Sequence, residues 1–286
     1  MPILVTGGSG FIGSHFLARL SVGAVSLDLV PPKVALSRHV YLCVDVCDFS
    51  SLVSVLQPFS DDIDCVVHLA GKPGVRDSFV DPTECARANI CGFLNVLKLI
   101  ENLKVGKLVF ASSSSVLDLQ SPYAVCKRSI ELFAQQWSTG GCSCVALRFF
   151  TVYGPGGRPD MAVGRFIRAA KTGEPMEVFG DGSARRQFTY VDDAVDGIFA
   201  ALTPIDEVYD VGTRYSCFDI GGPGEPASVN DLVQIIAEAT GTSVSVVHRP
   251  AARGDTKITR ANNTLIQPKI DLKTGIQRTL LTCLHV

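Results

Sequence analysis

The first half of the chain alternates short apolar runs with longer stretches in which apolar residues recur at helical spacing. The apolar runs predict strands near 2–6, 24–28, 40–44, 64–69, 107–112 and 143–148. The periodic stretches predict helices near 11–21, 50–57, 83–102 and 122–138. Strands that alternate with helices in this way predict an α/β fold, a doubly wound parallel sheet with helices on both faces.

Three glycines, Gly7, Gly10 and Gly13, stand between the first predicted strand and the first predicted helix. Glycines at this spacing let the backbone approach a pyrophosphate, whose charge the N–H groups at the start of the helix stabilise. Asp28 ends the second apolar run, where an acid would bind the adenosine ribose and would repel the 2′-phosphate of NADP. The motif predicts a Rossmann-type NAD-binding domain; the alternative is a glycine-rich turn beside a surface aspartate.

The local composition of the sequence changes after Phe150. Glycine, proline and arginine cluster at 154–159 and glycine again at 180–182, which indicates loops around a site. Further helical patterns lie at 161–173, 191–202 and 228–240, and the tail at 265–286 is mixed. We expect an NAD-binding domain over 1–150, to which a segment near 188–213 returns, and a smaller α/β substrate-binding domain over 151–286.

Composition narrows the functional classes. The chain has 286 residues, 47% of them hydrophobic, enough to build one large or two interlocked domains. The net charge of −2 and the absence of a basic block argue against nucleic acid or an anionic membrane as the main partner. The first predicted strand starts so close to Met1 that we expect no signal peptide, and no apolar run reaches membrane-spanning length. The 10 cysteines are scattered without a C-x-x-C pair, which predicts reduced thiols, no metal site and a cytoplasmic protein.

Tyr123 and Lys127 are four residues apart in a predicted helix, so both side chains share one face. A lysine cation beside a phenol stabilises the phenolate and lowers the pKa of the tyrosine. Such a tyrosine can take a proton from a hydroxyl group. The spacing alone is common by chance, and it gains weight because the glycine motif opens the same chain.

Several segments together resemble the extended short-chain dehydrogenase/reductase family of nucleotide-sugar enzymes. They are 6–13, 68–70, 112–116, 123–127, 148–155 and 186–193. Within that family, the residues from Gly74 to Ser78 and from Thr151 to Met161 are most similar to those of the UDP-glucuronate 4-epimerases. His68 lies in one of these segments, but we assign it no chemistry.

The resemblance implies a role for each matching residue. Tyr123, Lys127 and Ser113 would be catalytic, although Ser113 could instead cap the following turn. The residues that would bind NAD are Gly7, Gly10, Phe11, Ile12, Gly13, Asp28, Asp45, Val46, Leu69, Ala70, Asn89, Tyr123, Lys127 and Phe150. The residues that would bind a UDP-sugar are Arg76, Ser114, Ser115, Thr151, Arg158, Arg186 and Arg253.

Among the latter, Thr151 and Arg158 would receive a sugar carboxylate, because a guanidinium suits a planar carboxylate. A solvated surface arginine is the alternative for Arg158. The implied reaction is inversion at C4 of a UDP-hexuronic acid, UDP-glucuronate to UDP-galacturonate, through a 4-keto intermediate, with NAD kept bound. Related dehydratases and decarboxylases carry acids where this chain has Ser114 and Ser115, which favours epimerisation.

The chain also departs from the family pattern. Only residues 117–122 join Val116 to Tyr123, where the family has a longer loop, and Gln187 replaces an expected aspartate. A catalytically weak NAD-binding sensor is therefore an alternative, as is another nucleotide-sugar epimerase, dehydratase or decarboxylase. The family also implies a homodimer through the helices near 83–102 and 122–138, although their outward faces are not clearly apolar in the sequence.

Overall fold

The computed structural model describes residues 3–203, 214–251 and 253–282. The chain divides into two compact units, Met1–Arg148 with Ile198–Phe218, and Phe149–Gly197 with Asp219–Val286. The first unit thus ends close to the expected boundary at 150. Of the segment near 188–213 that we expect to return to it, the part from Ile198 is assigned to this unit, and 204–213 lie outside the described residues.

A seven-stranded sheet of order β11-β6-β5-β4-β1-β2-β3 dominates the fold. Its strands are β1 Ile3–Thr6, β2 Ala24–Asp28, β3 His39–Cys43, β4 Cys65–His68, β5 Lys107–Ser113, β6 Ser143–Phe149 and β11 Tyr215–Ile220. The pairs from β3 through β2, β1 and β4 to β5 are parallel. The predicted doubly wound, Rossmann-type fold is confirmed. The strand order reverses between β1 and β4, and ligands of such sheets bind at the carboxyl ends of the strands at this point.

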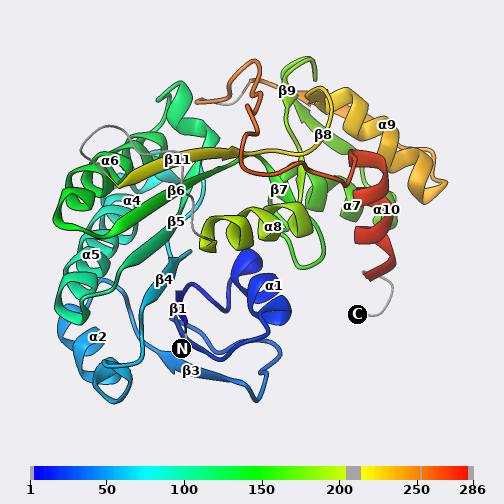
Figure 1. Ribbon diagram of the computed structural model, residues 1–286. Helices are drawn as coiled ribbons and strands as arrows, with labels where there is room; N and C mark the ends of the chain where they lie inside the picture. Colours follow the sequence, from blue (N-terminus) through cyan, green and yellow to red (C-terminus); the bar gives the residue numbers. More distant parts are fainter. Residues whose placement is uncertain (1–2, 204–213, 252, 283–286) are drawn as a thin grey trace. The chain divides into compact units, whose positions relative to one another are not determined.

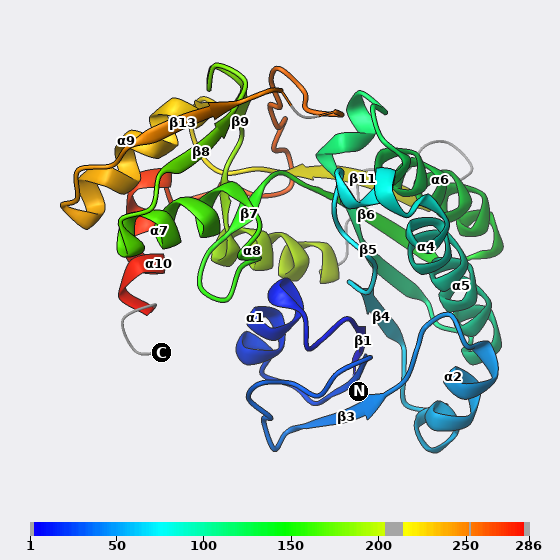
Figure 2. The same ribbon diagram turned by 180° about the vertical axis from the view of Figure 1, so that it is seen from behind.

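Helices of the first unit cover both faces of this sheet. They are α1 Phe11–Arg19, α2 Phe49–Leu56, α3 Asp77–Val80, α4 Pro82–Ala86, α5 Gly92–Leu103 and α6 Pro122–Trp137. Figures 1 and 2 show α2, α4, α5 and α6 together along one side of the strands. Leu52, Phe93 and Ile130 from these helices share one buried cluster with Leu108 of β5. On the other face, the ring of Phe16 in α1 lies 5.1 Å from that of Phe199.

The helix predicted over 83–102 is interrupted. Between α4 and α5 the chain forms a π-helical turn, η2 Arg87–Cys91. A π-turn inserts an extra residue into a helix and is often found at functional sites. Here it carries Asn89, one of the residues expected to bind the cofactor.

The second unit contains helices α7 Ala162–Thr172, α9 Val229–Thr240 and α10 Leu272–Thr282, and α8 Val191–Leu202 begins in it. Its strands form pairs: β7 Val152–Tyr153 with β10 Thr189–Tyr190, β8 Met176–Phe179 with β13 Val246–Arg249, and β9 Arg185–Arg186 with β12 Ala227–Ser228. The three helices predicted in this half are confirmed within one residue at each end. The strands and α10 were not predicted.

No helix among the residues that the structure describes has the length and apolar character needed to cross a membrane.

Candidate active site

At two positions of the turn between β1 and α1, a side chain would clash with the backbone. Gly7 has a φ of 75°, and a Cβ added to it would lie 2.5 Å from the backbone nitrogen of Ala70. A Cβ on Gly13 would lie 2.2 Å from the carbonyl oxygen of Gly7. Side chains at these positions would clash with rigid backbone, so both glycines are needed to form the turn.

Clashes within the turn do not explain why residue 10 is glycine. A Cβ there would meet only the Gly7 carbonyl oxygen, at 3.1 Å, so the turn itself leaves space above this residue. Gly10 is also the N-cap of α1, and no side chain caps this helix end. The first N–H groups of α1, from Phe11, Ile12 and Gly13, thus have no acceptor within their own helix. An open backbone surface beside unsatisfied N–H groups fits a pyrophosphate.

Gly8 also belongs to this turn, although the spacing pattern did not include it. A Cβ on Gly8 would lie 2.0 Å from Oγ of Ser26 in β2. Gly8 thus lets the turn pack against the neighbouring strand. The adjacent Gly7-Gly8 pair in the sequence was the available signal.

The carboxylate of Asp28 is fixed at the end of β2. Oδ2 accepts a hydrogen bond from the backbone N–H of Ser9 at 2.9 Å, and Oδ1 accepts one from Leu29 at 2.7 Å. The first of these bonds ties the acid to the glycine turn. Asp28 therefore lies beside the proposed pyrophosphate site, as a ribose-binding acid requires.

Asp45 has a partner that sequence reasoning missed. Its side chain accepts hydrogen bonds from the Cys47 N–H at 2.8 Å and from Arg87 at 3.0 Å. Burial alone would raise the pKa of Asp45, but these hydrogen bonds outweigh it and lower the pKa. The carbonyl oxygen of the next residue, Val46, accepts a bond from the Asn95 amide at 3.0 Å. This loop, whose residues Asp45 and Val46 are expected to bind NAD, is thus held in place from η2 and α5.

Tyr123 and Lys127 share one face of α6, as their spacing predicts. Ser121 caps this helix by accepting from the Ala124 N–H at 3.1 Å. The ammonium nitrogen Nζ of Lys127 lies 5.9 Å from the centre of the Tyr123 ring. It also donates a 2.9 Å hydrogen bond to the carbonyl oxygen of Ala111 in β5. The lysine is therefore anchored to the sheet while its charge faces the phenol.

Burial weakens the charge of Lys127. The residue is 5% exposed, and the loss of solvation lowers the pKa of its ammonium group from 10.5 to about 8. The ammonium is thus present below pH 8 and is lost as the pH rises through that value. A group poised near neutral pH is typical of active sites.

Asn89 presents an unpaired oxygen close to this lysine. Its amide nitrogen donates to the carbonyl oxygens of Lys72 at 3.0 Å and Cys85 at 2.9 Å. Its Oδ1 is buried, with no hydrogen-bond partner in the described part of the chain. A Cβ on Gly71 would lie 2.7 Å from this oxygen and 3.6 Å from Nζ of Lys127. An acceptor and an ammonium around a side-chain-free position fit a hydroxyl-bearing ligand such as a ribose.

Ser113 lies at the end of β5, immediately before the short turn η3 Ser114–Leu117. Its Oγ lies 2.7 Å from Oγ of Ser115 and accepts a bond from the Ser115 N–H at 3.3 Å. The capping role considered for Ser113 is therefore present. Ser114 completes a short hydroxyl-rich segment at this end of the sheet, and Ser112 turns inward to other partners.

Residues at the end of β4 complete the first unit's site. The backbone nitrogens of Leu69 and Ala70 donate to Thr6, the latter to its Oγ1 at 3.3 Å. His68 Nδ1 lies 2.7 Å from the same Oγ1, and burial lowers the pKa of His68 to about 3. This histidine is a neutral, packed residue, in agreement with its lack of an assigned role. Arg76, expected to bind substrate, is exposed at the start of α3.

Arg158, in the second unit, is already paired. Its guanidinium makes a two-point ion pair with Asp160, with Nε 3.0 Å from Oδ1, and this bond lowers the pKa of Asp160. Sequence reasoning missed Asp160, although an acid two residues after an arginine was a visible signal. If another carboxylate replaced that of Asp160, the planar guanidinium of Arg158 could donate two hydrogen bonds to it in the same way.

The other expected residues of this unit lie on separate elements. Phe150 has a fully buried side chain, and Thr151 accepts a backbone bond from Thr189 at 3.1 Å. Arg186 ends β9 and donates to the Arg185 carbonyl oxygen at 2.9 Å, whereas Arg253 is exposed.

Gln187 departs from the family pattern with a clear structural consequence. The residue is 4% exposed, and its amide nitrogen donates to the carbonyl oxygens of Gly222 at 2.6 Å and Gly224 at 2.9 Å. A carboxylate could not donate these bonds. The glutamine thus holds the 222–224 loop next to Arg186.

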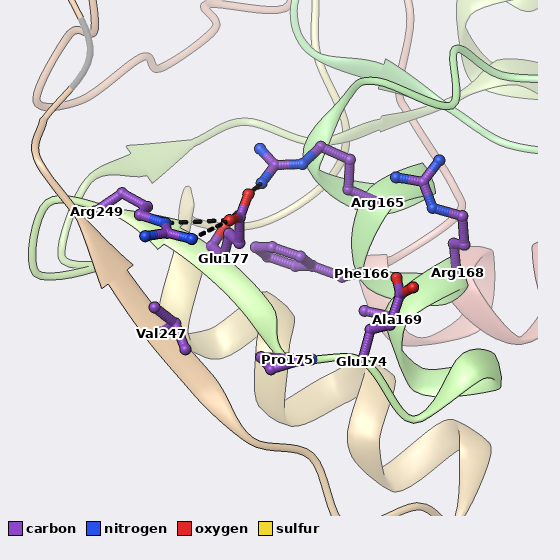
Figure 3. Close-up of a pocket in the computed structure, with 9 residues that line it drawn as sticks. All are labelled: Arg165, Phe166, Arg168, Ala169, Glu174, Pro175, Glu177, Val247 and Arg249. Carbon is purple, nitrogen blue, oxygen red and sulfur yellow. Dashed lines mark hydrogen bonds and ion pairs between the residues drawn. The ribbon is translucent and has the colours of Figure 1, made fainter.

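A hollow of about 270 Å³ in the second unit contains none of the expected site residues (Figure 3). It lies among α7, β8 and β13. Glu177 on its floor pairs with Arg165 at 3.0 Å and Arg249 at 2.7 Å. Three of the five charged side chains that line it are therefore paired with one another. Within the described residues, no cluster of His, Cys, Asp or Glu side chains could hold a metal ion.

Comparisons with known proteins agree with this geometry. The profile of the "NAD dependent epimerase/dehydratase family" matches residues 3–212. A UDP-glucuronate 4-epimerase of Thermodesulfobacterium geofontis is 31% identical over 314 aligned residues, which cover 97% of this chain and 94% of the relative. The solved structure of MoeE5 in complex with UDP-glucuronic acid and NAD is 34% identical, with a TM-score of 0.89 and coverage of 100% of this chain and 99% of that one. The UDP-glucuronic acid 4-epimerase of Bacillus cereus, solved with UDP-glucuronic acid and NAD, is 31% identical, with a TM-score of 0.85 and the same coverage.

Proposed function

The chain belongs to the NAD-dependent epimerase/dehydratase family, and we propose that it inverts C4 of a UDP-sugar, converting UDP-glucuronate to UDP-galacturonate. The observation that carries this proposal is the placement of Lys127 Nζ 5.9 Å from the Tyr123 ring, in a unit that also contains the glycine turn and Asp28. The relatives named UDP-glucuronate 4-epimerase support the choice of reaction and sugar.

In this mechanism Tyr123, as a phenolate, takes the proton of the 4-hydroxyl group and later returns it. Lys127, held by the Ala111 carbonyl oxygen, stabilises the phenolate. Ser113 donates a hydrogen bond to the sugar oxygen as it becomes a carbonyl. The redox chemistry at C4, removal of a hydride and its return to the opposite face, is what bound NAD supplies. The glycine turn, Asp28 and Asn89 are the residues that would hold this cofactor.

The choice of a uronate depends on Thr151 and Arg158. The guanidinium of Arg158 already holds a carboxylate at two points, that of Asp160. The sugar carboxylate would share or replace this contact. We assign Arg76, Arg186 and Arg253 to the UDP part of the substrate. Ser114 and Ser115 would face the sugar, where their lack of acidity disfavours dehydration and decarboxylation.

A catalytically weak NAD-binding sensor is the second candidate, and the shortened loop before Tyr123 is the observation that favours it. In this loop Leu119 has a φ of 53°, a left-handed conformation that is unusual for leucine. A loop this short covers less of a sugar than the longer one of the family. A sensor would retain NAD but turn over no UDP-sugar.

The homodimer is also a proposal, and α6 supports it. Val125, Leu132 and Phe133 lie on the outward side of this helix and are 51%, 47% and 41% exposed. No clearly apolar outward face was visible in the sequence, but in the structure these three exposed apolar side chains share one side of α6. We also keep a cytoplasmic setting in the proposal, because the nine described cysteines are free thiols, which suit a reducing compartment.

Replacement of Tyr123 by phenylalanine tests the reaction. Tyr123→Phe removes the proton carrier, so we expect 4-epimerisation of UDP-glucuronate, followed by NMR, to fall by about 10²- to 10⁴-fold. NAD released on denaturation should stay at the wild-type level, because the glycine turn is intact. Tyr41→Phe, at a phenol in β3, is the matched control and should keep full activity. Undiminished epimerisation by the Tyr123 variant would exclude this mechanism.

A further inference from the structure

We propose that Glu131 and Arg148 are positioning residues for the catalytic pair: their buried ion pair fixes α6 against the sheet and balances the charge beside Lys127. The inference rests on the proposed function of Tyr123 and Lys127. It concerns a cluster of polar groups on the same helix, one turn beyond the lysine, to which the mechanism above assigns no role.

Glu131 extends the stripe formed by Tyr123 and Lys127, since each residue follows the previous one by four positions. The side chain of Glu131 is only 1% exposed, yet both of its oxygens are engaged. Arg148 of β6 donates to them at two points, each 2.8 Å long. Ser112 of β5 donates at 2.6 Å, and Arg128 on α6 itself at 2.8 Å.

These contacts fix the register between α6 and β5. The Ala111 carbonyl oxygen holds Lys127, the next residue Ser112 holds Glu131, and the one after it is Ser113. The two anchors lie one helical turn apart. A shift or rotation of α6, and with it of Tyr123, relative to β5 would therefore break both anchors and the two-point bond to Arg148.

With Glu131 1% and Arg148 21% exposed, this ion pair adds little net stability compared with apolar side chains of similar size, because the charges lose most of their hydration. Removal of one partner has a large effect, since the other charge then remains buried and unbalanced. Here one partner, Glu131, lies one helical turn from Lys127, so the imbalance would arise close to that lysine. Burial has the largest effect on the pKa of Lys127 and lowers it. The negative charge of Glu131 acts in the opposite direction and raises this pKa.

The other titratable groups around the two residues contribute less at neutral pH. Cys217 and Tyr215 of β11 face Glu131, and burial raises the pKa of Tyr215. His68 of β4, Cys85 of α4 and Cys126 of α6 surround Lys127. His68 is neutral, and burial raises the pKa of Cys126 to about 12. Apart from the Tyr123 phenolate that the mechanism requires, the charged groups around Lys127 are therefore Glu131, Arg148 and the half-exposed Arg128.

Two single substitutions should shift the titration of Lys127 in opposite directions. Glu131→Gln leaves the Arg148 cation unbalanced, so the lysine should lose its proton about one pH unit lower. Arg148→Met leaves the carboxylate in excess, so the lysine should keep its proton to about one pH unit higher. The double variant should return close to the wild-type value. Arg128→Gln, which removes a charge that solvent already screens, is the control and should shift it by much less.

Two readouts follow this titration. One is the NMR signal of the Lys127 ammonium in ¹⁵N-lysine-labelled protein, assigned with Lys127→Met, and the other is the high-pH limb of kcat for UDP-glucuronate. In each variant, the pKa of Lys127 from NMR and the pH of the kcat limb should shift by the same amount. The kcat should fall while KM stays within about twofold of wild type, because positioning acts on the reacting atoms. Shifts in the same direction, or none, would overturn the charge-balancing role.

Ser112→Ala keeps the positioning role testable even if a single charge variant does not fold. It removes a hydrogen bond from a neutral donor to Glu131 and no charge, so we expect a folded protein with at least about fivefold lower kcat and an unshifted pH limb. A wild-type kcat for this variant would overturn the register role. The NMR titration does not depend on turnover. If the wild-type protein is inactive but the variants shift the Lys127 titration in opposite directions, only the proposed function is refuted. If the wild-type protein is active but the variants show no such shifts, only this inference is refuted.

Discussion

At the scale of single residues, three charged groups expected to take part in binding or catalysis are each fixed by a specific partner. Lys127 is held by a carbonyl oxygen, Asp45 by Arg87, and Arg158 by Asp160. Fixed charges need little rearrangement when a substrate or a transition state arrives, which is the main source of electrostatic catalysis. The Arg158–Asp160 pair differs from the others, since its partner is the same chemical group as the sugar carboxylate that we assign to it.

This competition leads to a prediction about substrate choice. Arg158→Ala removes the donor fork, so kcat/KM for UDP-glucuronate should fall by about 10- to 100-fold, while kcat/KM for UDP-glucose changes little. Asp160→Asn removes the competing carboxylate, and the KM for UDP-glucuronate should fall by about twofold to fivefold. Steady-state kinetics with both sugars measure the two effects.

Asp181→Asn is the matched control, because it neutralises another aspartate of the same unit, one that binds Ser183. It should leave the KM for UDP-glucuronate at the wild-type value. If Arg158→Ala lowered activity on both sugars equally, the uronate assignment would be wrong.

At the scale of secondary-structure elements, the site is built from strand ends and helix starts. Thr6 ends β1, Asp28 ends β2 and Ser113 ends β5, while Tyr123 lies in the first turn of α6. Parallel strands bring such ends to one edge of the sheet. The glycine turn serves both folding and binding: Gly7 and Gly13 allow the turn to form, and Gly10 leaves space for a pyrophosphate.

This division gives a paired prediction for the turn. Gly10→Ala adds a Cβ that meets only one atom at 3.1 Å, so the fold should be retained while the NAD content of the purified protein falls. Gly13→Ala places its Cβ 2.2 Å from the Gly7 carbonyl oxygen, so the free energy of unfolding should fall by more than about 2 kcal/mol. Urea unfolding and cofactor analysis separate the two outcomes. Equal loss of stability in both variants would contradict this division of roles.

The same elements show how far the sequence alone could lead. The strands β1, β2 and β4 and the helix α6 were predicted within a residue or two, because their apolar spacing matches their burial. The π-turn around Asn89 was not, since its residues continue a helical pattern without a break. In the second unit, β7, β9, β10 and β12 have two residues each, and β13 is exposed along its length, so no periodicity marks them.

The candidate site shows the same limit. Tyr123, Lys127, Asp28 and the three spaced glycines could be predicted, because each belongs to a motif with fixed local spacing. Arg87, which pairs with Asp45 across 42 positions, could not, because only the folded chain brings the two together. The Glu131–Arg148 pair depends on tertiary packing in the same way.

At the scale of the whole molecule, the exposed apolar side chains of α6 indicate a contact between two copies. Phe133→Asp places a charge among Val125 and Leu132, so the protein should elute as a monomer where the wild type elutes as a dimer. Light scattering coupled to size exclusion measures the mass directly. Val53→Asp, at an exposed apolar residue of α2, is the control and should not change the mass. A wild type that is monomeric at all concentrations would refute the dimer.

The central claim is that the protein oxidises and then reduces C4 of the sugar within one bound complex. The most direct test uses UDP-glucuronate deuterated at C4 in ordinary water, with the product analysed by NMR. We predict UDP-galacturonate that retains the deuterium at C4, because the same hydrogen leaves and returns. A product that carries solvent hydrogen at C4, or no product while bound NAD is present, would contradict the account.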